Sequence, residues 1–213
     1  MTFEEEIKYS LIEIRKAYRA LAVYHRFCLD LCKKIDTMLN TIITTGMTNY
    51  MWDSNVGKPP QSGDNLHKSK AVAFLPLWDF VRLLLPEKTD RNYPIIEKND
   101  WLFVMRLSSD TGFEGDMNKD VNVDLLKDPE ECESTLKLYI YYANETVQCD
   151  WKRLFSHNEW PKTGVKTFVK QAPEILAYSE KYHLSELTDD SRIKIKVSEF
   201  LKGAKRELNV VFG

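Results

Sequence analysis

The chain opens with an alternation of apolar and polar positions that predicts one long helix. No Gly or Pro interrupts residues 3–45, and the apolar stripe recurs at alternating steps of four and three residues. This heptad pattern is typical of a helix that packs along one side. The stripe consists of Ile7, Leu11, Ile14, Tyr18, Leu21, His25, Cys28, Cys32, Ile35, Leu39 and Ile42. We predict a helix over residues 1–46, roughly 60 Å long at about 1.5 Å per residue.

A helix of that length exceeds the diameter of a small domain, so the pattern has two interpretations. Additional apolar residues at Ala17, Tyr24, Leu31 and Met38 widen the stripe, which favours packing on the chain's own domain. The heptads also suit a coiled-coil contact between chains, and both interpretations stay open. The predicted interface residues are Ile7, Leu11, Ile14, Tyr18, Leu21, Cys28, Cys32, Ile35 and Leu39.

Residues 47–213 are predicted to form a single globular domain with two recognisable strands. Residues 101–107 are apolar at nearly every position, which indicates a strand covered on both faces. Residues 135–143 alternate, with Leu and Ile on one face and mainly Tyr on the other, which predicts an aromatic outer face. An acidic loop near residues 108–134 joins the two strands.

The remaining segments are assigned by turn formers and by apolar spacing. We expect a loop over residues 46–69, a short strand over 71–75 and a helix from Pro76 through Leu85. Further helices are expected over residues 150–160, 173–183 and 189–208, with a strand as the rival at the start of the last segment. The predicted class is therefore α+β, with the long amphipathic helix and C-terminal helices around a small antiparallel sheet.

Composition narrows the function classes without selecting one. The net charge is −2, so no global field attracts nucleic acid or an anionic membrane. The N-terminus lacks the pattern of a signal peptide, and four cysteines are too few for a disulfide scaffold, so we expect a cytoplasmic protein with free thiols. No apolar run is long enough to cross a bilayer, and no membrane partner is expected.

Motifs for catalysis are weak. There is no Gly-x-Ser-x-Gly, phosphate-binding Gly-rich loop, dinucleotide fingerprint or His-Glu-x-x-His. His25, Cys28 and Cys32 share the stripe and are an alternative metal-ligand set. Arg19 and His25 have an Arg-x5-His spacing that resembles the nuclease motif of HEPN-type ribonucleases, which would imply phosphodiester cleavage at an all-helical dimer interface. Enzymatic activity therefore stays uncertain and is not favoured, and no cofactor is predicted.

Aromatic residues gather near basic ones in the second half of the chain. Tyr139, Tyr141, Trp151, Phe155 and Trp160 could form a core, a protein-binding patch or a stacking surface for single-stranded nucleic acid. We expect a non-enzymatic protein that self-associates or docks onto a larger complex through its long helix and this patch. The alternatives are a nucleic-acid-binding or nuclease-type protein of the toxin or defence class, and a small-molecule sensor.

Overall fold

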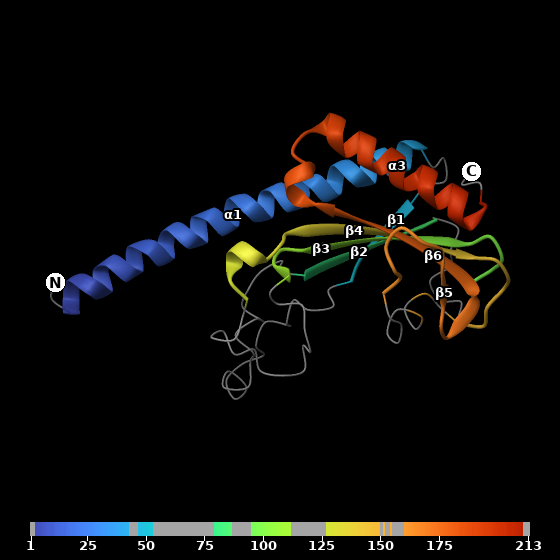
Figure 1. The fold of residues 1–213 in the computed structure, drawn as a ribbon, viewed down its shortest axis with the longest axis horizontal. Coiled ribbons are helices and arrows are strands. Elements are labelled where there is room, and N and C mark those ends of the chain that lie inside the picture. Colours follow the sequence, from blue (N-terminus) through green and yellow to red (C-terminus); the bar gives the residue numbers. More distant parts are fainter. Residues whose placement is uncertain are drawn as a thin grey trace.

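The computed structural model describes residues 3–42, 47–52, 79–86, 95–111, 127–149, 151, 154 and 160–210. Two long helices lie on one face of an antiparallel sheet of six strands (Figure 1). Helix α1 spans Phe3–Ile42 and helix α3 spans Asp190–Leu208. The predicted α+β class is therefore confirmed.

The sheet has the strand order β1-β2-β3-β4-β6-β5, and every neighbouring pair is antiparallel. Its strands are β1 (Met47–Trp52), β2 (Asp79–Pro86), β3 (Trp101–Ser108), β4 (Thr135–Ala143), β5 (Thr167–Val169) and β6 (Ala172–His183). Two short 3-10 helices, η5 (Pro129–Glu131) and η6 (Leu184–Glu186), precede β4 and follow β6. Successive strands along the chain mostly lie side by side, as is usual for antiparallel sheets.

The two predicted strands, β3 and β4, form the centre of the sheet and pair over their whole length. Side chains of a strand alternate between the two faces, so each of these strands contributes to two separate cores. The first core lies between the sheet and the helices and includes Phe103, Leu138, Tyr178 and Phe200. The second core lies on the opposite face of the sheet.

The second core shows that the predicted aromatic outer face of β4 is wrong. Tyr139 and Tyr141 are buried there with Leu102, Val104 and Trp151. Because this face is covered as well, Tyr139 and Tyr141 are interior residues. Tyrosine side chains end in a polar hydroxyl group, so their alternation in the sequence did not indicate that a second layer of the chain would cover this face.

Helix α3 begins and ends where the sequence indicated. The carboxylate of Asp189 accepts a hydrogen bond from the backbone N–H of Arg192, which satisfies a free donor of the first turn. Asn209 ends the helix in the left-handed conformation, with φ 56°. Ile195 is 55% exposed although Ile193 and Val197 are buried, so the rival strand is excluded and the helical period holds.

Three other predictions from sequence are wrong. Residues 173–183 form strand β6 and not a helix, because β4 offers an unpaired edge along nine residues. Residues 79–86 form strand β2 where a helix was expected, and residues 47–52 form strand β1 within the expected loop. Short apolar runs do not distinguish strand from helix by their period, and here pairing between distant segments decided. The expected strand over 71–75 and most of the expected 150–160 helix lie outside the described residues.

Helix α3 is fixed to strand β6 at close range. The hydroxyl of Tyr182 donates to the carbonyl oxygen of Lys196 at 3.1 Å, and the ammonium of Lys196 lies 5.6 Å from the centre of the Tyr182 ring. Further along, a Cβ added to Gly203 would lie 2.9 Å from Cζ of the buried Tyr178. The absence of a side chain at this position therefore sets the distance between helix and sheet.

We predict that Gly203→Ala destabilises the protein. Alanine raises helix propensity by about 1 kcal/mol over glycine, but overpacking against the buried Tyr178 ring costs about 1–3 kcal/mol, so the net change is destabilising. Urea unfolding followed by circular dichroism measures the free energy of unfolding. Lys202→Ala, at the exposed neighbouring position, is the control and should change stability by less than about 0.5 kcal/mol. An increase in stability in Gly203→Ala would contradict the close packing.

Candidate interaction surface

The first half of α1 projects beyond the sheet (Figure 1). Every described side chain of residues 3–20 is exposed. The stripe residues are among them, with Ile7 44%, Leu11 47%, Ile14 50% and Tyr18 69% exposed. In a monomeric globular protein, a helix with such a stripe normally packs the stripe against the hydrophobic core. We call Ile7, Leu11, Ile14 and Tyr18 the exposed stripe.

The second half of α1 buries its part of the apolar stripe against other elements of the same chain. Cys28, Cys32, Ile35 and Leu39 are buried in the first core, and Leu21 is half-buried at the boundary. These four buried residues were predicted as interface positions, and in this structure they contact the chain's own sheet and α3. The predicted interface is therefore divided, and only its first half is open to a second molecule.

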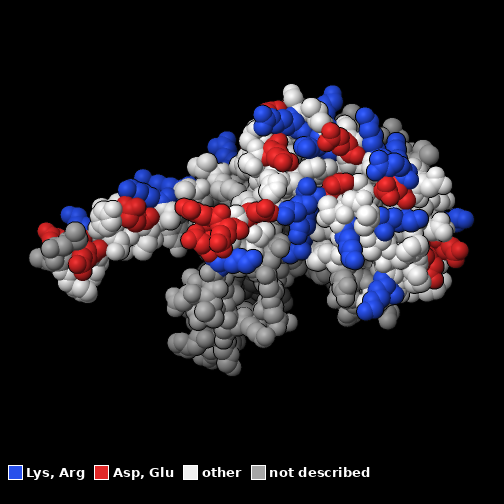
Figure 2. Space-filling view, viewed as in Figure 1, with Lys and Arg blue, Asp and Glu red and all other residues white. Residues whose placement is uncertain are grey.

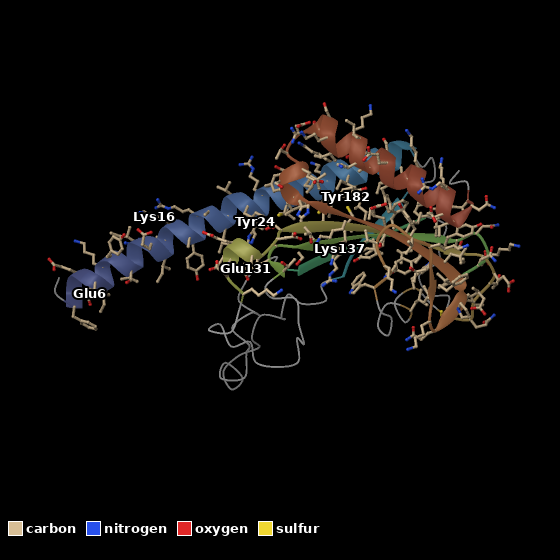
Figure 3. All side chains as sticks on the ribbon, in the orientation of Figure 1. Glu6, Lys16, Tyr24, Glu131, Lys137 and Tyr182 are labelled. Carbon is tan, nitrogen blue, oxygen red and sulfur yellow. The ribbon has the colours of Figure 1, made fainter. Side chains whose placement is uncertain are left out.

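The exposed stripe continues the heptad pattern of the buried face, with a drift of about 20° per heptad on a straight helix. The heptad spacing keeps Ile7 to Leu39 on one side of the helix. From Cys28 onward this side is covered by the sheet, and before Tyr18 it is exposed. The side chains along the projecting half extend into solvent in Figure 3. The apolar stripe of α1 thus extends beyond the part of the helix that the sheet and α3 cover.

Charged residues flank the exposed stripe. Lys8 and Arg15 each directly follow a stripe residue in the sequence, so they lie along one edge of the stripe. Lys16 forms an ion pair with Glu13 at 2.8 Å between Nζ and Oε1, on the exposed surface. Exposed pairs of this kind contribute little stability, so they do not explain why the projecting half is helical.

The metal site predicted as an alternative on α1 is not assembled among the described residues. Among the described residues, no group of three or more His, Cys, Asp or Glu side chains is placed to hold a metal ion, so His25, Cys28 and Cys32 do not form such a group. Arg19 is exposed and His25 is half-buried, with its ring 6.2 Å from that of Tyr24. The six-stranded sheet also differs from the all-helical bundle that the HEPN resemblance implied.

The predicted aromatic patch is mostly interior. Tyr139, Tyr141 and Trp151 are buried in the second core, and Phe155 lies outside the described residues. Trp160 alone of the described members is exposed; its ring lies 4.8 Å from that of Tyr139, and the guanidinium of Arg106 lies 4.9 Å from its centre. Three of the five predicted patch residues thus belong to a structural layer under the sheet.

A family model described as PM0109 matches residues 4–209. The chain belongs to the PM0109 family. The match begins in the first turn of α1, so it includes the projecting half of this helix. A search of curated proteins and a search of solved structures each found no match to this PM0109 family member. Within the described part of the chain, neither helix combines the length and the apolar character needed to cross a membrane.

One group of side chains in this PM0109 family member was not predicted. Arg106, Lys137 and Lys181 stand on three neighbouring strands, on the face of the sheet away from the helices. Figure 3 labels Lys137 on this side and Tyr182 on the side of α3, and Figure 2 shows basic side chains next to the acidic group around η5. The three are distant in the sequence, and only the strand register brings them together.

We predict that the four cysteines differ sharply in reactivity. Cys28 and Cys32 are buried, and burial raises the pKa of the Cys28 thiol, so the reactive thiolate is scarce at neutral pH. Cys132 and Cys149 are only partly buried. Alkylation with iodoacetamide followed by peptide mass spectrometry should modify Cys132 and Cys149 first, and Cys28 and Cys32 only after urea is added. Equal rates at all four would show that the second half of α1 is not docked on its own sheet.

Proposed function

We propose that this protein is a non-enzymatic assembly subunit that self-associates through the projecting half of α1. The observation that supports the proposal is the exposed stripe of Ile7, Leu11, Ile14 and Tyr18. Most of the stability of a helix in a protein comes from packing of its apolar face and not from intrinsic propensity. A projecting helix with an uncovered stripe is therefore incomplete as a single molecule, and a second copy of the same helix supplies the missing surface.

The side of α1 that bears the stripe favours an antiparallel arrangement. A second helix laid parallel and in register would continue past Leu21 into the space that the sheet occupies, because from Cys28 onward the same side is buried. In an antiparallel pair the two sheets lie at opposite ends. The heptads then place Ile7 opposite Tyr18 of the second copy and Leu11 opposite its Ile14. Such a symmetric contact closes on itself as a dimer.

The antiparallel arrangement has an electrostatic consequence. It brings Lys8 close to Arg15 of the second copy, twice by symmetry, whereas a parallel pair would keep these residues apart. Like charges at the edge of a helix pair weaken association, and salt screens them. The proposed dimer should therefore become tighter as the salt concentration rises, in addition to the general effect of salt on apolar contacts.

We predict that Leu11→Asp abolishes the dimer. A carboxylate at the centre of the apolar contact should weaken association by roughly 30-fold or more, equivalent to about 2 kcal/mol. Analytical ultracentrifugation and native mass spectrometry measure the association. Tyr9→Asp is the matched control, because Tyr9 is equally part of the projecting half and is 63% exposed on the opposite side of the helix. A wild-type protein that stays monomeric at every concentration, or equal effects of both variants, would contradict self-association through the stripe.

We also predict that Lys8→Glu strengthens the dimer. The substitution converts two repulsive contacts with Arg15 into attractive ones, and a change of roughly 0.5 kcal/mol at each contact tightens association about fivefold. The double variant Lys8→Glu with Arg15→Glu restores like charges and should return the affinity to near the wild-type value. Sedimentation equilibrium at low salt measures both. If Lys8→Glu leaves affinity unchanged while Leu11→Asp abolishes it, the helices pair in another orientation.

A further inference from the structure

One side of helix α3 carries a line of exposed lysines. Lys194, Ser198, Lys202 and Lys205 follow one another at steps of four, four and three residues, so they lie on one side of the helix. The three lysines are exposed and span roughly 16 Å along the axis, at about 1.5 Å per residue. Figure 2 shows basic side chains gathered over α3. We call Lys194, Lys202 and Lys205 the lysine face.

The carboxylates of α3 do not neutralise the lysine face. The helix has six basic and three acidic residues, a net charge of +3 in a chain whose net charge is −2. Each acidic residue of α3 forms an ion pair with a basic residue outside the lysine face: Asp190 with Lys34, Glu199 with Lys196, and Glu207 with Arg206. The ammonium groups of the three lysines have no hydrogen-bond or ion-pair partner among the described residues. Their positive charge is therefore available to a ligand.

The electrostatics of the helix account for only part of this arrangement. The helix dipole favours basic residues in the last turn, which explains Lys205 and Arg206. Lys194 and Lys202 lie outside the last turn and gain nothing from the dipole. Lys202 also stands three residues before Lys205 and four before Arg206, spacings at which like charges on a helix repel each other. The positions of Lys194 and Lys202 are therefore not explained by charge interactions within α3.

The shape of the lysine face suits an extended anion. Lys194 and Lys202 are eight residues apart, about 12 Å along the axis, so a line of several phosphates matches them better than one phosphate does. Duplex nucleic acid carries one negative charge per roughly 1.7 Å of its axis. A duplex laid along α3 therefore presents several phosphates to the three lysines at once.

Two other extended anions fit the lysine face less well. Proteins that bind single-stranded nucleic acid stack its bases on exposed aromatic side chains, and the one aromatic residue of α3, Phe200, is buried. A helix that lies on an anionic membrane inserts an apolar face into the lipid. The apolar side of α3 is packed in the first core, and Ile195 is the single large apolar residue of this helix that is exposed.

We propose that the lysine face of α3 binds the phosphate backbone of a nucleic-acid duplex without reading its sequence. Contacts from lysine to phosphate fix the position of a protein on a duplex and carry no sequence information. Helix α3 lies over the sheet, whereas the exposed stripe is in the projecting half of α1 (Figure 1). The lysine face is therefore separate from the proposed self-association, and each copy of the chain carries a complete one.

The test measures binding of the full chain to a short labelled DNA duplex by fluorescence anisotropy, from low to moderate salt. Two duplexes of unrelated sequence should bind the wild type equally well. The triple variant Lys194→Gln, Lys202→Gln and Lys205→Gln should weaken binding about tenfold or more at low salt. It should also lower the slope of log Kd against log salt by roughly two to three, because each phosphate contact contributes about 0.9 to this slope. Glutamine is close to lysine in helix propensity, so α3 stays intact.

The matched control removes the same charge from another part of the surface. Lys162, Lys166 and Lys170 are exposed next to β5, and replacing all three by Gln changes the net charge by the same amount. This control should keep the affinity and the salt dependence of the wild type. Equal losses in the two triple variants would overturn the proposal, because the net charge of the chain and not the lysine face would then determine binding.

Two further measurements test the choice of partner. The same titration with a single strand of equal length should show weaker binding than the duplex, and sedimentation with vesicles that contain phosphatidylserine should leave the protein in solution. The proposal is overturned if the wild type does not bind the duplex at low salt, if it binds the single strand more tightly, or if it binds the vesicles and not the duplex. Leu11→Asp should still bind the duplex through the lysine face, so loss of the dimer and loss of duplex binding can be told apart.

Discussion

The packing of the second half of α1 on the sheet is the contact on which the rest of the structure depends. Leu31, Ile35 and Leu39 are fully or almost fully buried in the first core, where they meet α3 and the central strands. This contact fixes the direction of the whole helix, because a continuous helix is stiff over many turns. The projecting half therefore carries its stripe away from the body, in line with a face that is already occupied further along.

The two halves of α1 show how one heptad pattern can serve two purposes. The buried half packs its apolar residues against the chain's own sheet and not against a second molecule. The exposed half has the same spacing of apolar residues, but no part of the described chain covers them. Ion pairs on the helix, such as Lys34 with Asp190 at 2.6 Å, are exposed and add little to either contact. Burial of apolar surface thus stabilises the docked half of the helix. In the projecting half, the same stabilisation would be gained only when a second molecule covers the exposed stripe.

The two faces of the sheet differ in character. The face toward the helices is mainly apolar, with Glu180 between Tyr178 and Tyr182 on β6, whereas the opposite face changes from an apolar core to the basic residues Arg106, Lys137 and Lys181.

The sequence by itself determined the elements whose signal is local. The heptads and the lack of Gly and Pro predicted α1, Asp189 and the apolar spacing predicted α3, and unbroken or alternating apolar runs predicted β3 and β4. It also supplied the candidate stripe, since residue spacing alone defines one side of a helix. Four of those interface residues then proved to be interior, because burial depends on where a helix ends up and not on its period.

Only the tertiary structure decided the features that need two distant segments. Residues 173–183 have a helix-compatible composition and became β6 because β4 presented a free edge, and the tyrosines of β4 became interior because a second layer covers them. The grouping of Arg106, Lys137 and Lys181 exists only through strand register, and a one-residue shift of a strand would move its basic residue to the other face. Spacing within one element can be read from sequence, whereas pairing between elements is settled by the total burial and hydrogen bonding of the fold.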